Sequence, residues 1–218
     1  MREALALYGR ALEDGAASSG PAGPLLRYED GASLPFPVGR YLAVADPLDR
    51  QLLDGVHGPV LDVGCGPGRH LRELSARGVY AFGVDLSSVA VELACSGGAR
   101  AMVADIFGEV PGAGSWRTAL LLDGNIGIGG DPVRLLTRLR ALLDPDGVVL
   151  VELDAPGASP PPARARLELA GESSDWFAWA RVAACQAAAV ATDAGMMMEW
   201  EWSCAGRWFA RLRPHACA

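Results

Sequence analysis

The stretch that decides the fold reads VLDVGCGPGRH over residues 60–70. Together with Pro59, residues 60–63 form a mostly apolar run that predicts a short buried strand over 59–63, which leads through three alternating glycines into a helix. Glycine permits backbone angles closed to other residues and lets a ligand approach the main chain closely. Because open α/β sheets bind their ligands beyond the carboxyl ends of the strands, this loop predicts a ligand site.

Around this loop, short apolar runs alternate with helical segments. The expected strands are 59–63, 79–84, 100–103, 118–122 and 148–153, and the expected helices are 69–77, 88–95 and 132–143. The strands are apolar throughout instead of alternating, which indicates a parallel sheet covered on both faces. A strand over 176–182, a helix over 184–194 and a hairpin of strands 197–205 and 207–213 are expected to follow. We therefore predict an α/β fold with a Rossmann-like, doubly wound seven-stranded sheet, mostly parallel with an antiparallel C-terminal edge hairpin.

The beginning of the chain does not follow this rhythm. Residues 2–13 have helical periodicity, and residues 25–31 fit either a short hairpin or a loop. Asp46 and Pro47 then have the residue types of a helix N-cap and first helical position. We expect residues 1–45 to form an N-terminal lid or cap segment and residues 46–218 to form the main domain, interrupted by a Pro-rich stretch at 159–163.

Composition excludes several classes of function. The formal net charge of −7 argues against nucleic-acid binding, which needs a basic surface. The 19 basic residues are all arginine, so neither Schiff-base chemistry nor a P-loop lysine is available. The five cysteines show no C-x-x-C spacing, so we expect no metal site and reduced thiols in a cytoplasmic protein. Neither a signal peptide nor a membrane span is expected.

Two acidic residues follow the next two predicted strands. Asp85 lies seventeen residues beyond Gly68, in the sequence GVDLS, and Asp105 lies in ADIF. A carboxylate at the first position can accept hydrogen bonds from both hydroxyls of a ribose. Taken singly, the loop fits a tight turn and Asp85 fits a helix cap, but their order after consecutive strands favours a nucleoside site. The glycine register is G-x-G-x-G, one residue shorter than the dinucleotide pattern, which disfavours a pyrophosphate.

Four segments resemble, in order, the motifs of class I S-adenosylmethionine-dependent methyltransferases: VLDVGCGPGRH, GVDLS, ADIF and the strand over residues 118–123. The resemblance covers roughly residues 46–154, while the first 45 residues match only loosely, as a lid. It implies S-adenosylmethionine as cofactor and S-adenosylhomocysteine as product. The cofactor residues that it implies fall into four groups. The methionine portion would contact Gly64, Cys65 and Gly66, with Asp62 ordering the loop or the ammonium group. Asp85 would hold the ribose and Leu86 would pack on the adenine, whose edge would be bordered by Asp105 and Ile106. Leu122 and Asp123 would lie near the sulfonium and the acceptor.

The acceptor site is less defined by the sequence. Residues 123–130 read DGNIGIGG, without the prolines and aromatic residue that amino-methylating nucleic-acid enzymes carry there, which argues against a nucleobase acceptor. This segment fits either one wall of a small-molecule pocket, with Asn125 on it, or a flexible crossover loop. Trp176 and Trp179 are candidates for an aromatic substrate wall. His70 fits a structural role or a place near the cofactor, and no catalytic base is predicted.

We therefore predict a methyltransferase that acts on an oxygen, nitrogen or carbon atom of a small molecule. By analogy, this molecule belongs to specialised metabolism. A second reading keeps the cofactor but changes the chemistry, to a cyclase or to one component of a two-protein enzyme. A nicotinamide-dependent oxidoreductase is disfavoured by the glycine register. A binding module with a vestigial cofactor site is the fourth reading, although the glycines and both acidic residues are intact.

Overall fold

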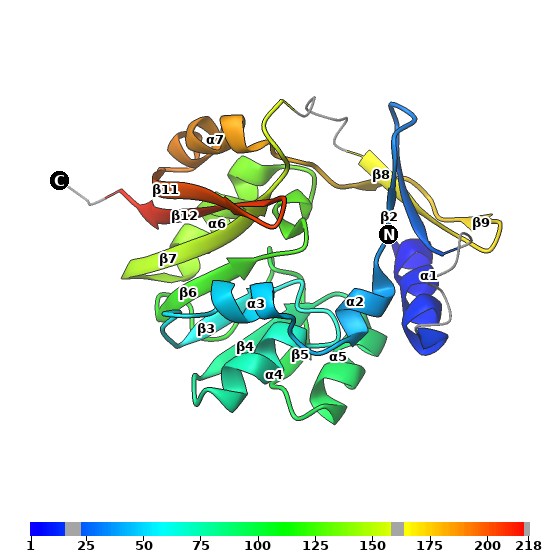
Figure 1. Cartoon of the computed structure of the whole chain (residues 1–218), viewed down its shortest axis with the longest axis horizontal. Coiled ribbons are helices and arrows are strands. Elements are labelled where there is room, and N and C mark those ends of the chain that lie inside the picture. The colour runs from blue at the N-terminus through cyan, green and yellow to red at the C-terminus, as the bar shows by residue number, and fades with distance from the viewer. Residues whose placement is uncertain (16–22, 158–163, 216–218) are drawn as a thin grey trace.

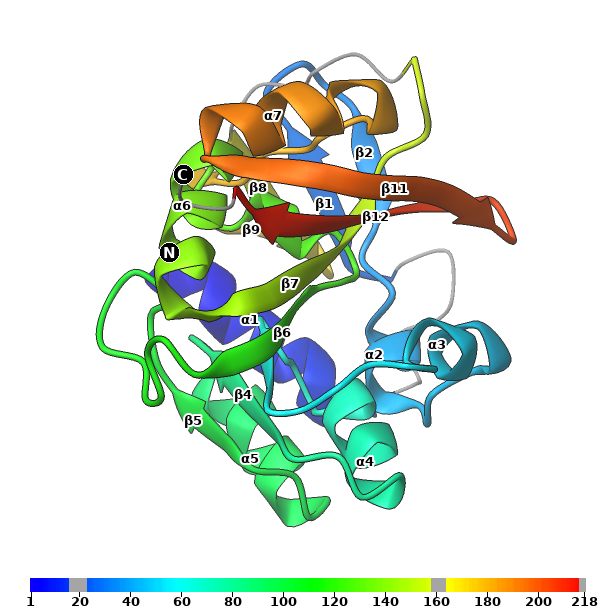
Figure 2. The same cartoon turned by 90° about the vertical axis from the view of Figure 1, so that its left-hand side faces the viewer.

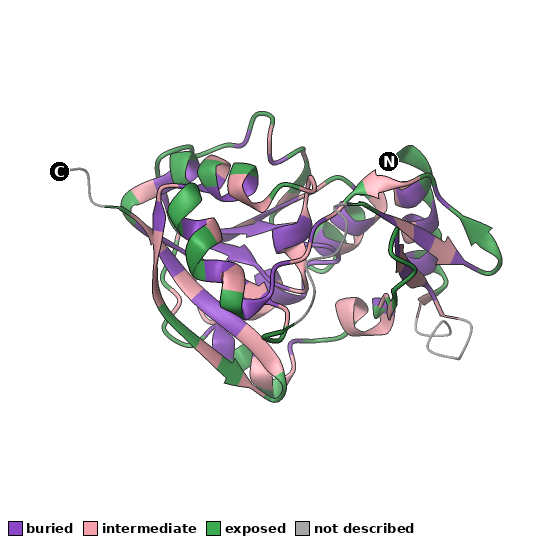
Figure 3. Cartoon of the chain, turned by 90° about the horizontal axis from the view of Figure 1, so that it is seen from above, coloured by how far each residue is buried: buried purple, intermediate pink, exposed green. Residues whose placement is uncertain are grey.

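The computed structural model describes residues 1–15, 23–157 and 164–215. The Pro-rich stretch 159–163 lies outside these ranges. A large twisted sheet with helices on both faces forms the main body, and a smaller sheet with a helix stands beside it as a cap (Figure 1). Buried residues concentrate along the strands of the main sheet, while the outward sides of the helices are exposed (Figure 3).

The main sheet has seven strands in the order β11-β12-β7-β6-β3-β4-β5. The five strands β7, β6, β3, β4 and β5 run parallel, whereas β12 is antiparallel to both β7 and β11. This architecture confirms the predicted sheet with its antiparallel edge hairpin. The strand bounds are Val60–Val63 (β3), Ala81–Asp85 (β4), Ala101–Val103 (β5), Trp116–Leu121 (β6), Leu143–Leu153 (β7), Met196–Cys204 (β11) and Arg207–Pro214 (β12).

Successive residues of the central strands belong to opposite cores. In β6, Ala119 and Leu121 pack into the cluster beneath α6 and α7, while Leu120 packs into the cluster beneath α3 and α4. Both faces are therefore covered, which is why these strands read as continuous apolar runs. The helices are α3 (Pro47–Leu52), α4 (Arg69–Ala76), α5 (Ser88–Ser96), α6 (Pro132–Leu142) and α7 (Ala187–Asp193), with α7 preceded by the 3-10 helix η3 (Ala184–Gln186).

The cap is built from two parts of the chain that lie far apart in sequence. The second sheet has the order β10-β8-β1-β2, with β9 paired to β8, so the N-terminal hairpin pairs with the segment that follows β7 (Figure 2). The helix α1 packs against β8 and shares a core with it. The cap elements are α1 (Arg2–Glu13), β1 (Leu25–Tyr28), β2 (Ser33–Pro35), α2 (Val38–Leu42), β8 (Arg164–Leu169), β9 (Glu172–Ser173) and β10 (Phe177–Ala178).

Two expectations change at the cap. The predicted strand over 176–182 is only the two-residue β10, followed by single bridges from Trp179 to Ile128 and from Ala183 to Asp154. The strand β8 was not predicted, although its buried residues alternate with exposed or half-buried ones. The hairpin reading of residues 25–31 is correct, and its pairing with β8 means that the cap draws on both sides of the division expected at residue 45. That division remains a prediction.

Candidate cofactor and acceptor site

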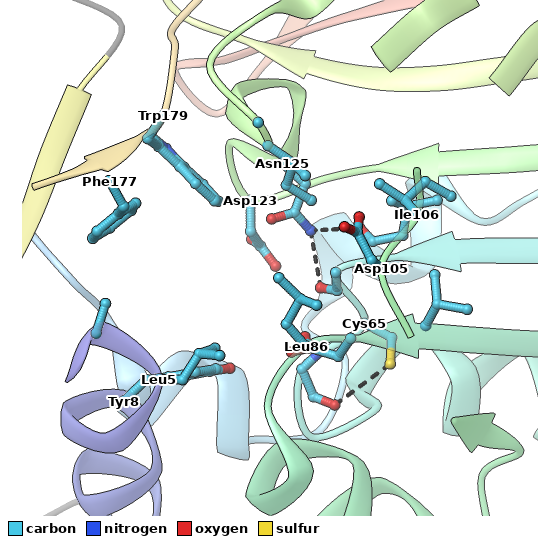
Figure 4. Close-up of a pocket in the computed structure, with 18 of the residues that line it drawn as sticks. Leu5, Tyr8, Cys65, Leu86, Asp105, Ile106, Asp123, Asn125, Phe177 and Trp179 are labelled. Carbon is cyan, nitrogen blue, oxygen red and sulfur yellow. Dashed lines mark hydrogen bonds between the residues drawn. The ribbon is translucent and has the colours of Figure 1, made fainter. Parts of the chain in front are cut away.

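A cavity of about 430 Å³ lies between the carboxyl ends of the parallel strands and the cap. Ten of the thirteen predicted site residues line it, all except Asp62, Leu122 and Trp176. Figure 4 shows the arrangement: Leu86, Asp105 and Asp123 project from the strand ends, and Leu5, Tyr8, Phe177 and Trp179 face them from the cap. Residues from both halves of the molecule therefore share one cavity.

The glycine loop has the backbone that its sequence predicts. Gly64, Gly66 and Gly68 have φ values of 70°, 53° and 83°, in the region that favours glycine. The side chain of Asn125 fixes the loop, because its Nδ2 donates to the carbonyl oxygens of Val63 at 2.8 Å and Gly64 at 2.9 Å. A Cβ atom on Gly64 would lie 2.8 Å from that nitrogen. Asn125 thus lines the cavity and holds the loop in place.

Asp85 lies at the end of β4 and holds its carboxylate against the loop. Its Oδ2 accepts from the backbone N–H of Gly66 at 2.9 Å, and its Oδ1 accepts from that of Ser87 at 2.8 Å. Each oxygen keeps a further lone pair for another donor, so the carboxylate can also accept from a ribose. The next residue, Leu86, is 39% exposed although it is apolar, and it projects into the cavity. The flat face of a nucleobase packed on Leu86 would cover this apolar surface.

The far end of the cavity is formed after β5. Asp105 is exposed and its Oδ1 accepts from the backbone N–H of Phe107 at 2.9 Å, which orders the turn. Ile106 is buried and also lines the cavity. The ring of Phe107 lies against Gly129, and the guanidinium of Arg134 stacks on it at 4.0 Å from the ring centre. These groups form an end wall suited to a flat ring with a polar edge.

Two predicted residues lie behind the cavity wall. Leu122 is buried in the core between the sheet and α3 and does not line the cavity, and its expected place near the sulfonium stays a prediction. Asp62 is buried beneath the glycine loop, where its Oδ2 has no hydrogen-bond partner among the described residues and lies 3.9 Å from Nδ1 of His70. Burial raises the pKa of Asp62 to about 6. Of its two expected roles, the structure favours ordering the loop over direct contact with a ligand.

An ionic cluster that the sequence did not reveal lies beneath the cavity as its floor, and three of its members, Arg69, His70 and Asp123, line the cavity itself. Asp49 is fully buried and lies 3.1 Å from Arg40, 3.1 Å from Arg69 and 3.4 Å from Arg207. Asp123 extends the cluster into the cavity. The members come from α2, α3, β3, α4, β7, β12 and the turn after β6, and they are Arg40, Asp46, Asp49, Asp62, Arg69, His70, Asp123, Glu152 and Arg207.

Arg69 fixes both Asp123 and His70. Its Nη2 donates to Oδ2 of Asp123 at 2.6 Å and lies 2.9 Å from Nε2 of His70. Because a guanidinium has no acceptor, Nε2 must accept, which places the ring proton on Nδ1. Burial disfavours the charge of Asp123, but the guanidiniums of Arg69 and Arg40 keep its pKa below the usual value. Asp123 also has a φ of 55°, an uncommon backbone for a residue with a side chain.

The cap supplies an aromatic wall, defined here as Tyr8, Phe36, Tyr41, Phe177 and Trp179. Three pairs of these rings meet edge to face: Tyr8–Phe36 at 5.5 Å, Phe36–Tyr41 at 5.3 Å and Phe177–Trp179 at 6.2 Å between ring centres. Burial raises the pKa of Tyr8 and of Tyr41 well above the ordinary range. Of this wall, the sequence predicts only Trp179 at the site, because the positions of the other rings depend on how the cap folds back.

The two predicted tryptophans separate in the structure. Trp179 lines the cavity, and the backbone of the next residue, Ala180, donates to the carbonyl of Gly127 at 2.9 Å. The glycine-rich segment after β6, including the 3-10 helix η2 (Asn125–Gly127), is therefore a docked wall of the cavity and not a free crossover loop. Trp176 packs instead against the guanidinium of Arg166, 5.1 Å from its ring centre, and does not line the cavity, so its place on a substrate wall stays a prediction.

Among the described residues, no group of histidine, cysteine and acidic side chains is arranged to hold a metal ion. Nor does any helix within the described ranges have the length and apolar character needed to cross a membrane. Cys65 is buried on the cavity wall, where its Sγ contacts the carbonyl of Gly66 at 3.6 Å and burial raises the pKa of the thiol. The site can therefore bind a nucleoside and orient a second molecule, with Asp85 and Asp105 held by backbone N–H groups and Asp123 held by Arg69.

Comparison with known proteins agrees with this geometry. The methyltransferase domain family matches residues 39–205. A search of curated proteins found no match. Among solved structures, an S-adenosylmethionine-dependent methyltransferase from Bacteroides fragilis, in complex with S-adenosylhomocysteine, is 24% identical with a TM-score of 0.76, and the match covers 95% of this chain and 94% of that one.

Two further structures share the fold at lower similarity. The 1,6-didemethyltoxoflavin-N1-methyltransferase from Burkholderia thailandensis, with bound 1,6-didemethyltoxoflavin and S-adenosylhomocysteine, is 18% identical with a TM-score of 0.59, covering 82% of this chain and 81% of that one. A protein described for the conversion of a disulfide bond into a thioacetal group during echinomycin biosynthesis is 19% identical with a TM-score of 0.60, covering 81% and 85%.

Proposed function

Because the chain belongs to the methyltransferase domain family, we propose that it transfers a methyl group from S-adenosylmethionine to a small molecule. The observation that carries this proposal is the single cavity that extends from Asp85 and Leu86, past Asp123, to Trp179. Its strand side has the features of an adenosyl site, and its cap side offers an apolar surface for a second molecule. A cavity of about 430 Å³ that must hold both favours a small acceptor.

The residues around the strand ends fit S-adenosylmethionine. Gly64 and Gly66 leave the backbone open, and a Cβ atom on Gly66 would lie only 3.1 Å from the hydroxyl of Tyr8. We assign the ribose to Asp85, the adenine to Leu86, Asp105 and Ile106, and the methionine portion to the glycine loop. When bound, the sulfonium supplies an activated methyl group.

The chain's contribution to the reaction is positioning. The methyl carbon must lie in line between the donor sulfur and the acceptor atom, and holding two reactants in such a geometry can supply about 7–11 kcal/mol. The glycine loop, fixed by Asn125, holds one reactant, and the aromatic wall holds the other. The apolar rings of the cap above the strand ends also reduce the access of water to the space between them.

We infer that the acceptor belongs to specialised metabolism. Support comes from the structural neighbours, one of which has a bound small molecule and one of which is described for echinomycin biosynthesis. The aromatic wall favours a flat or apolar acceptor over a sugar or a peptide backbone.

Calorimetric titration with S-adenosylmethionine and S-adenosylhomocysteine tests the proposal, with NAD as the negative control. We expect Asp85→Asn to weaken S-adenosylhomocysteine binding about tenfold or more, since a hydrogen bond to a charged group contributes about 1.5–3 kcal/mol. Asp193→Asn, at an exposed carboxylate that ends α7, should change nothing. Absence of binding by the wild-type protein, or equal affinities of the two variants, would refute the assignment.

A further inference from the structure

The charge of the cavity floor is unbalanced. In the ionic cluster, five carboxylates (Asp46, Asp49, Asp62, Asp123 and Glu152) face three guanidiniums (Arg40, Arg69 and Arg207), which leaves an excess of two negative charges. His70 does not offset them, because its Nε2 accepts from Arg69 and the ring is therefore neutral. The buried position of Asp49 and Asp62 limits screening by solvent. The floor therefore favours positive charge in the cavity above it.

The opposite side of the cavity favours the same sign of charge. The rings of Phe177 and Trp179 face Asp123 across the cavity, with Leu5 and Tyr8 beside them (Figure 4). Aromatic faces attract cations, by about 0.5–2 kcal/mol for each well-placed ring. A molecule seated between Asp123 and Trp179 thus meets a carboxylate on one side and aromatic rings on the other.

The acid and base groups of this region are already engaged. Asp123 accepts from Arg69 at 2.6 Å, and the acceptor nitrogen of His70 is 2.9 Å from the same guanidinium. A hydroxyl acceptor would need a group to take its proton during the transfer. A neutral nitrogen with a free lone pair needs none, so these engaged groups suit it.

We propose, on the basis of the proposed function, that the acceptor is a flat aromatic nitrogen nucleophile that is neutral near pH 7. The nitrogen lone pair forms the new N–C bond while the C–S bond breaks, and the electron pair of that bond stays on sulfur. The sulfonium becomes a neutral thioether and the positive charge passes to the acceptor nitrogen. The aromatic wall and the excess negative charge of the floor both stabilise the positive charge on the acceptor nitrogen, during the transfer and on the product.

A binding measurement tests the proposal without turnover. The protein is first saturated with S-adenosylhomocysteine, whose amino-acid group carries one charge of each sign and leaves the excess of the floor in place. N-methylisoquinolinium and methylnaphthalene, which share shape and differ in charge, are then titrated by calorimetry. We expect the cation to bind about tenfold more tightly than its neutral counterpart. Equal binding, tighter binding of methylnaphthalene, or no binding of either would overturn the proposal.

Variants assign the effect to the wall and the floor. Trp179→Leu and Asp123→Asn should each reduce the preference for the cation several-fold, whereas Trp200→Leu, at a tryptophan that is 52% exposed on β11, should not. Phe177→Leu gives a second measurement of the wall if Trp179→Leu unfolds. A loss of affinity that is equal for both ligands would mean that the wall provides only apolar contact, which contradicts the proposal.

The same experiment tests the proposed function and the nature of the acceptor separately. If S-adenosylhomocysteine itself fails to bind the wild-type protein, the proposed function is refuted. If it binds and the cation is not preferred, only the nature of the acceptor is refuted.

Discussion

Asp49→Asn tests whether the ionic cluster stabilises the floor of the site. The Asp49 side chain is 0% exposed and lies within 3.4 Å of three guanidiniums, those of Arg40, Arg69 and Arg207. The substitution removes one negative charge from among them and leaves the shape of the side chain nearly unchanged. Removing one partner of a buried ion pair costs about 3–5 kcal/mol, because the other charge stays buried without compensation. We expect the free energy of unfolding to fall by about that amount.

Urea unfolding followed by circular dichroism measures this loss. Asp54→Asn is a matched control, since Asp54 also pairs with an arginine, at 2.7 Å from Arg77, but its side chain is 73% exposed. An exposed pair contributes about 0–1 kcal/mol. If the two variants lose the same stability, the reasoning about the cluster is wrong.

The pH dependence provides a second check on the same substitution. Burial alone would raise the pKa of Asp49, but the Arg69 guanidinium beside it and the hydrogen bond from the backbone N–H of Asp46 lower it well below its usual value of 3.8. A carboxyl group with a lowered pKa in the folded state stabilises the fold above its unfolded pKa, and this stabilisation is lost as pH falls toward the folded value. The difference between wild type and Asp49→Asn should therefore be constant from about pH 8 to pH 5 and shrink below about pH 4. A difference that grows on acidification would contradict the assignment.

Further substitutions test the glycine loop and its surroundings. Gly64→Ala places a Cβ 2.8 Å from Asn125 and should weaken S-adenosylhomocysteine binding about tenfold by calorimetry, whereas Gly55→Ala, at a similar φ in open space, should not. Asp62→Asn should raise the free energy of unfolding by up to about 3 kcal/mol near pH 8, where burial disfavours the charged carboxylate. It should change the free energy of unfolding little near pH 4, because the carboxyl group is neutral below its raised pKa of about 6. Equal effects in thermal unfolding at the two pH values would argue against this. Tyr8→Phe should weaken cofactor binding several-fold without lowering the unfolding midpoint, and a lower midpoint would indicate a structural role instead.

The main sheet and the glycine loop were predictable because their signals are local. Each central strand is an apolar run that both faces bury, and each is followed at once by the residues that it delivers to the cavity, as β4 delivers Asp85 and Leu86. Order along the chain is then enough to predict which side chains meet, since the carboxyl ends of parallel strands lie at one edge of the sheet.

The cap and the ionic cluster were not predictable because they depend on pairing between distant segments. Leu26 in β1 pairs with Leu167 in β8, and neither sequence indicates its partner. Trp176 and Trp179 looked equivalent in the sequence, but only the docking of Ala180 on Gly127 directs one of them to the cavity. Charged residues such as Asp49 read as solvated or capping groups until their partners from other elements are known.

The way the two halves meet has a consequence for how specificity is built. The groups assigned to the cofactor come from the ends of β3, β4 and β5, whereas the aromatic wall comes from the cap, which pairs within its own sheet. Between them lies Asp123, held by Arg69 from the loop side and 3.8 Å from Arg40 of the cap helix α2. Changes at Phe177 and Trp179 of the wall can therefore alter the choice of acceptor without disturbing the cofactor groups. A change in the ionic cluster should affect both, because Asp49 and Asp123 each pair with Arg40 of the cap and with Arg69 of the loop side.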